Sequence, residues 1–164
     1  MENENVTITD RYQLLSIRPE QTKNIKSIRI ENQVIDLTTG FALSSFDVDT
    51  EQVYFVDCSF SFGGEDILYE FPSVSKVGFI RCSLSYNTLK NLLISNNPHN
   101  DIEVLDLTGN DLGKDPKRFV NILKHSIYRV KKIEELILVD NGFDASVVSL
   151  IKGALHWFIG KIIF

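Results

Sequence analysis

The chain has 164 residues, a net charge of -5 and a hydrophobic content of 43%, which is ordinary for one soluble globular domain with a continuous core. Its acidic balance argues against a nucleic-acid partner, because such partners select for a basic stripe on the surface. We expect a cytoplasmic protein without membrane association, because no basic and apolar leader opens the chain and no apolar run is long enough to span a bilayer.

One sequence frame recurs five times along the chain. The frame has three apolar positions, separated by two residues and then by one, followed by a polar slot and one more apolar residue, and only Thr50 in the second copy is a weak match at the first position. The copies are IKSIRIENQVI (25–35), TEQVYFVDCSF (50–60), VSKVGFIRCSL (74–84), IEVLDLTGNDL (102–112) and IEELILVDNGF (133–143). Alternating apolar residues over such short segments predict a β-strand in each copy.

The polar slot carries a narrow set of residue types. The slot residues are Gln33, Cys58, Cys82, Asn110 and Asn141. The frame matches L-x-x-L-x-L-x-x-N/C-x-L, so the chain from about residue 25 onward resembles a leucine-rich repeat protein. The resemblance implies an α/β solenoid, a short curved horseshoe with a parallel sheet on its concave face and helices or turns on its convex face.

The segments between the strands predict helices that lengthen toward the C-terminus. Ser85 is a candidate N-cap for the third connection, and Asp115 followed by Pro116 predicts the start of the fourth. The second connection (63–71) has room for a turn or two, and the first (36–46) is expected to lack a regular helix. The longer repeats are similar to those of ribonuclease-inhibitor-like and NLR-type leucine-rich repeat proteins. The predicted inward positions are Leu89, Leu92, Leu93, Phe119, Ile122, Leu123, Val147, Leu150, Ile151 and Leu155.

We expect one domain over residues 1–164, because each repeat buries its apolar side only against its neighbours and both ends need a cap. Residues 1–24 form the N-terminal cap in this prediction, with a strand or turn before Pro19. Residues 25–155 hold about five repeats, and residues 156–164 form a C-terminal strand or cap. Ile162 and Phe164 match apolar positions of this last strand, so they either close the sheet or mediate self-association at an open edge.

The slot residues are predicted to have a structural role. An amide in this position both donates and accepts hydrogen bonds, so it satisfies backbone groups of the turn, and Cys is a weaker substitute that tolerates burial. No zinc site or other cofactor is expected, because the histidines lack ligand spacing. A nucleophilic cysteine lacks a nearby base, and a disulfide is disfavoured because side chains in register point the same way.

Residues between the apolar positions are expected to point out of the concave sheet. The functional interpretation is a protein-binding patch with a charged rim, and the alternative is that β-branched residues simply favour strands. The patch residues are Tyr54, Val56, Ile80, Ile137 and Val139. The rim residues are Arg29, Glu31, Asp57, Arg81, Asp106 and Asp140. Gly78, Thr108 and Gly109 interrupt the apolar stripe.

No catalytic motif is present in the sequence, so we do not expect an enzyme. The resemblance implies a recognition module that binds a protein partner through the concave sheet and adjoining loops. Two alternatives remain open. One is an inhibitor or immunity-type protein that neutralises an enzyme or toxin. The other is a structural fragment or subunit that assembles through its C-terminal edge.

Overall fold

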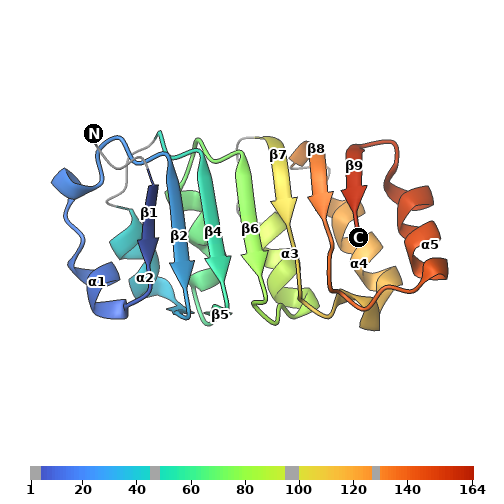
Figure 1. The fold of residues 1–164 in the computed structure, drawn as a ribbon, viewed down its shortest axis with the longest axis horizontal. Coiled ribbons are helices and arrows are strands. Elements are labelled where there is room, and N and C mark those ends of the chain that lie inside the picture. Colours follow the sequence, from blue (N-terminus) through green and yellow to red (C-terminus); the bar gives the residue numbers. More distant parts are fainter. Residues whose placement is uncertain (1–4, 45–48, 95–99, 127–129) are drawn as a thin grey trace.

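The structure is a computed structural model that describes residues 5–44, 49–94, 100–126 and 130–164. Within these ranges, seven strands form one parallel sheet, and they lie side by side in the order in which they occur along the chain (Figure 1). The strands are β1 (Asn5–Ile8), β2 (Ser27–Glu31), β4 (Gln52–Val56), β6 (Lys76–Ile80), β7 (Asn100–Asp106), β8 (Val130–Ile137) and β9 (Ile159–Ile163). Two short strands, β3 (Val34–Ile35) and β5 (Ser59–Phe60), pair in parallel as a separate small sheet.

The recurring frame falls on successive strands in one register. The second apolar position of each copy lies beside that of the next, which gives the row Ile28, Val53, Val77, Leu105 and Leu136, continued by Ile162. The row that follows includes Phe55 and Phe79, whose rings stack with centroids 5.4 Å apart. All of these positions except the half-buried Ile162 are fully buried, so the predicted strands and the inward residues of the five copies in these two rows are confirmed.

The helices follow the strands, and Figure 1 shows α2, α3 and α4 behind the sheet, with α1 and α5 toward its two ends. Their bounds are α1 (Arg11–Ser16), α2 (Leu37–Leu43), α3 (Tyr86–Ile94), α4 (Pro116–Ser126) and α5 (Ala145–Leu155), with short 3-10 helices η1 (Pro19–Gln21), η2 (Gly64–Glu70) and η3 (Leu112–Lys114). Both predicted caps are present: the Thr88 N–H donates to Ser85 Oγ (3.0 Å), and the Arg118 N–H donates to Asp115 Oδ1 (3.0 Å). No helix of the described ranges is both long and apolar enough to cross a membrane.

The prediction that the first connection lacks a regular helix is wrong. Asp36 begins α2 by accepting a hydrogen bond from the Thr39 N–H (2.9 Å), and the Thr39 side chain closes a capping box. This cap and the burial of Leu43 offset the low helix propensity of Gly40 and the threonines. The inward assignment of Leu150 is also wrong, because its side chain is 42% exposed while Ile151 and Leu155 form the buried face of α5.

The two ends of the chain extend the sheet. Residues 6–8 belong to β1, which pairs in parallel with β2, but the following segment forms helix α1 instead of a strand or turn. Asp10 begins this helix by accepting hydrogen bonds from the Tyr12 and Gln13 N–H groups. At the other end, the predicted last strand is confirmed as β9, and the ring of Phe164 packs edge-on against Phe143.

Candidate functional site

The two faces of the sheet differ in what covers them. One face packs against the helices in a single hydrophobic core, while the other is turned toward the viewer in Figure 1, with no helix in front of it. We call this second surface the open face. Across the strands its side chains form three rows: Ser27, Gln52, Lys76, Val104, Glu135 and Lys161; then Arg29, Tyr54, Gly78, Asp106, Ile137 and Ile163; then Glu31, Val56, Ile80, Thr108 and Val139.

The first of these rows was missed by the sequence analysis. The frame counts outward residues only after its second apolar position, whereas every one of these strands begins at least one residue earlier. Side chains alternate along a strand, so the residue just before the second apolar position also points to the open face. That alternation was the available signal, and it adds Lys76, Val104 and Glu135 to the surface.

Tyr54 lies flat across the centre of the open face. A Cβ added to Gly78, its register partner on β6, would lie 2.3 Å from Tyr54 Cδ1, so the ring occupies the space that any larger residue would fill. Burial raises the pKa of the Tyr54 hydroxyl, and the negative charges of Asp106 and Glu103 add to that rise. The absence of a side chain at Gly78 therefore leaves room for the Tyr54 ring, which fills this part of the surface.

Val56 does not face water, so its assignment to the exposed patch is wrong. Its exposed fraction is 1%, because it lies between its register partners Glu31 and Ile80 on the adjoining strands. Tyr54, Ile80, Ile137 and Val139 keep partial exposure, and Asp106 on β7 lies in register between the β6 and β8 residues.

Most charges on the open face are paired with one another. The guanidinium of Arg81 donates two hydrogen bonds to the Asp57 carboxylate, at 2.8 and 2.7 Å, and this contact lowers the pKa of Asp57. Two further ion pairs join neighbouring strands, Lys76–Glu103 and Lys161–Glu135, and Arg29 pairs with Glu31 along β2. Among the described residues, Asp106 and Asp140 have no such ion pair.

The residue directly before each slot residue lies in the turn that follows the strand. These five residues are Asn32, Asp57, Arg81, Gly109 and Asp140, and all have positive φ, between 51° and 72°. Asn, Asp and Gly tolerate this left-handed region, whereas Arg rarely adopts it. The bidentate contact with Asp57 holds Arg81 in this conformation. Asp57, Arg81 and Asp140 therefore border the open face at the C-terminal ends of the strands.

The slot residues link each turn to the one before it. Asn110 Oδ1 accepts hydrogen bonds from the Cys82 and Leu84 N–H groups at 3.1 and 3.2 Å, and its Nδ2 donates to the carbonyl oxygens of Phe79 and Leu107. Asn141 makes the same contacts one turn later, accepting from the Asn110 N–H at 2.9 Å. These side chains satisfy buried backbone groups that would otherwise lack partners.

The two cysteines occupy equivalent places and are free and buried. Cys58 Sγ lies 3.4 Å from the Ile30 oxygen and Cys82 Sγ lies 3.3 Å from the Phe55 oxygen, the carbonyls that correspond to Phe79 for Asn110. Burial raises the pKa of the Cys82 thiol to about 12 and also raises that of Cys58. Both thiols are thus protonated at neutral pH, which makes them poor nucleophiles.

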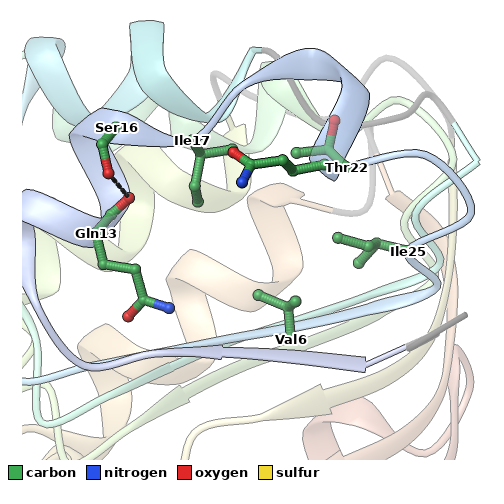
Figure 2. A pocket seen from close by; sticks show the side chains of 7 residues that line it. Val6, Gln13, Ser16, Ile17, Thr22 and Ile25 are labelled. Carbon is green, nitrogen blue, oxygen red and sulfur yellow. Dashed lines mark hydrogen bonds between the residues drawn. The ribbon is translucent and has the colours of Figure 1, made fainter.

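A pocket of about 240 Å³ lies between β1 and the α1–η1 segment (Figure 2). Its walls come from Val6, Gln13, Ser16, Ile17, Gln21, Thr22 and Ile25. None of these side chains is an acid or a base at neutral pH, and Ser16 Oγ already donates to the Gln13 oxygen at 3.1 Å. Within the described ranges, no group of three or more His, Cys, Asp or Glu side chains is placed to hold a metal ion.

Comparison with known proteins adds no relative to this description. No protein-family model matches the chain, and no curated protein matches its sequence.

Proposed function

We propose that the chain is a leucine-rich repeat solenoid that binds a protein partner, without catalysis, through its open face and the adjoining turns. The observation that carries the proposal is the open face itself. No described helix covers it in Figure 1, and it presents the Tyr54 ring with partly exposed Ile80 on the adjoining strand and partly exposed Ile137 and Val139 further along the sheet.

The chemistry of this surface favours recognition over catalysis. Tyrosine and arginine are enriched at the centres of protein interfaces, where a rigid aromatic ring contributes area at low entropic cost. Tyr54 is held in place by Gly78, and Arg81 is held by Asp57. A catalytic site would need an acid or base directed at a bound molecule, whereas the described carboxylates here are largely committed to ion pairs.

Affinity capture from the source cell, followed by mass spectrometry, tests the proposal. Tyr54→Ala and Ile80→Glu should abolish retention of the main captured protein, because each removes apolar contact area from the open face. Leu150→Glu is the matched control, since Leu150 is an exposed apolar residue on α5 and its replacement should leave capture intact. Equal capture by all three variants, or equal loss in all three, contradicts the proposal.

The inhibitor or immunity-type alternative uses the same surface. It differs in its consequence, because the captured partner would lose its own activity on binding. An activity assay of that partner, with and without the chain, separates it from a neutral recognition module.

The assembly alternative depends on β9, which ends the strand order and pairs with β8 alone among the described strands. An unpaired strand edge is a template for another chain, and Ile162 and Phe164 are only half-buried beside it. Light scattering tests this alternative: a mass of 18.7 kDa at every concentration excludes self-association through this edge.

A further inference from the structure

A second exposed apolar surface lies on the helix side of the sheet, where α2 packs beside η2. Leu37 is 51% exposed, Phe41 is 69% exposed and Phe62 is 92% exposed. We define the α2–η2 patch as these three residues together with Asp66 and Glu70. Large apolar side chains that gather in this way mark interaction sites more often than isolated ones do.

Leu37, Phe41, Asp66 and Glu70 of the patch line one small depression, and Phe62 directly precedes Gly63, which also lines it. Leu37 and Phe41 are one helical turn apart on α2, so both side chains lie on the same side of that helix. A Cβ added to Gly63 would lie 3.0 Å from Leu37 Cβ, so the loop that carries Phe62 is in contact with α2. The depression, of about 50 Å³, is lined by Leu37, Gly40, Phe41, Gly63, Asp66, Ile67 and Glu70.

The charge beside these apolar residues is negative, and two of its carboxylates lack an ion-pair partner among the described residues. Residues 61–75 contain Glu65, Asp66 and Glu70 but no Lys, Arg or His. Asn91 donates a hydrogen bond to Glu65, whereas Asp66 and Glu70 form no ion pair within the part of the chain that the structure describes. Burial raises the pKa of Glu70, so its carboxylate gains from any cation brought next to it.

We propose that the α2–η2 patch is a second docking surface, which binds a basic amphipathic helix of a partner protein. The apolar side of that helix covers Leu37, Phe41 and Phe62, and a Lys or Arg at its border pairs with Asp66 and Glu70. A helix suits the site because α2 presents its apolar side chains one turn apart, and a helix packed alongside offers residues at the same spacing. The positive charge follows from the uncompensated carboxylates.

Fluorescence anisotropy with two labelled peptides of equal length tests this surface on the full chain. Both peptides carry Leu at helical spacing, and the remaining positions are Lys in one and Glu in the other. We expect the Lys peptide to bind and the Glu peptide not to bind. Leu37→Ser and Phe41→Ser should each weaken binding about tenfold, because each removes apolar area from the contact.

Matched controls separate the patch from general attraction to an acidic protein. Leu150→Ser and Asp140→Asn remove an exposed leucine and a carboxylate elsewhere, and they should leave the affinity unchanged. Asp66→Asn with Glu70→Gln should weaken binding and reduce its dependence on salt. Phe62→Ser replaces a side chain that is 92% exposed, so it reports on binding in a chain whose core is intact.

Four results would overturn the proposal. The first is that the Lys peptide binds the parent, Phe62→Ser and Leu37→Ser with equal affinity, and the second is that the Glu peptide binds as tightly as the Lys peptide or more tightly. The third is that the parent binds anionic phosphatidylserine vesicles and Phe62→Ser abolishes this binding. The fourth is that the parent forms a concentration-dependent dimer that Phe62→Ser abolishes. The last two results assign the patch to a membrane surface or to a second copy of the chain. Tyr54→Ala should not change peptide binding, so failure here is distinct from failure of the open-face proposal.

Discussion

Replacing Asn110 by alanine tests whether the slot side chains hold successive turns together. The Asn110 side chain is 3% exposed, and its Oδ1 is the acceptor for the Cys82 and Leu84 N–H groups of the preceding turn. Its Nδ2 donates to the oxygens of Phe79 and Leu107. Of these two carbonyls, that of Leu107 keeps a second donor in the Asn141 side chain, at 2.9 Å.

The expected cost follows from which groups lose their partner. Two buried N–H groups lose their acceptor and one carbonyl, that of Phe79, loses its side-chain donor. A buried polar group without a partner costs about 1–3 kcal/mol, and neighbouring groups relax in part, so we expect Asn110→Ala to lower the free energy of unfolding by about 3 kcal/mol. For a chain of this size that corresponds to a melting temperature lower by about 6–12 °C.

Urea unfolding followed by circular dichroism measures this loss, and a graded series sharpens it. Asn110→Cys should cost about half as much, because a thiol can donate to the Phe79 oxygen as Cys82 does to Phe55 but is a weaker acceptor. Asn121→Ala on the exposed side of α4 is the matched control and should change stability by less than about 0.5 kcal/mol. An Asn110→Ala variant as stable as this control refutes the ladder argument.

Three further predictions concern packing and pH. Leu107→Ala, at a fully buried position, should lower the free energy of unfolding by about 2–5 kcal/mol in urea, and an unchanged midpoint would contradict its place in the core. Gly78→Ala should cost about 1–3 kcal/mol because the new Cβ meets the Tyr54 ring, and this cost should disappear in a Tyr54→Ala background, so additive effects in the double-mutant cycle would contradict the contact. The folded pKa of Cys82, about 12, lies above its ordinary value of 9.0. The contribution of this thiol to the free energy of unfolding should therefore be fully present below pH 9.0 and fall above that pH by up to about 1.4 kcal/mol per pH unit. Cys82→Ala should flatten this decline, and an unaltered slope would show that the thiol does not cause it.

The strands and their register were predictable because the signal repeats. One apolar alternation is weak evidence, but five copies with the same spacing place equivalent residues side by side when the strands pair in parallel. The helix starts at Ser85 and Asp115 were predictable for a local reason, since a cap acts on backbone groups within the next three residues. Neither inference needs knowledge of contacts between distant parts of the chain.

The errors arose where distant contacts or backbone conformation decide the outcome. The burial of Val56 depends on side chains that lie on two other strands, and the helix after Asp36 depends on packing that outweighs the propensities of Gly40 and its neighbours. The positive φ of Arg81 had no signal in residue type, because arginine rarely occupies that region. Such features follow from the assembled sheet and not from any single segment.

Salt dependence should separate the two proposed surfaces, because they differ in how their charges are compensated. On the open face, ion pairs such as Arg81–Asp57 already neutralise most of the charge within the protein, and among the described residues Asp106 and Asp140 are the exceptions. A partner therefore binds there mainly through apolar and aromatic area around Tyr54. On the α2–η2 patch, Asp66 and Glu70 stand without such a cation among the described residues. A partner that supplies one gains a charge-assisted contact that salt screens. Binding at the open face should therefore persist at high ionic strength, while binding at the patch should weaken.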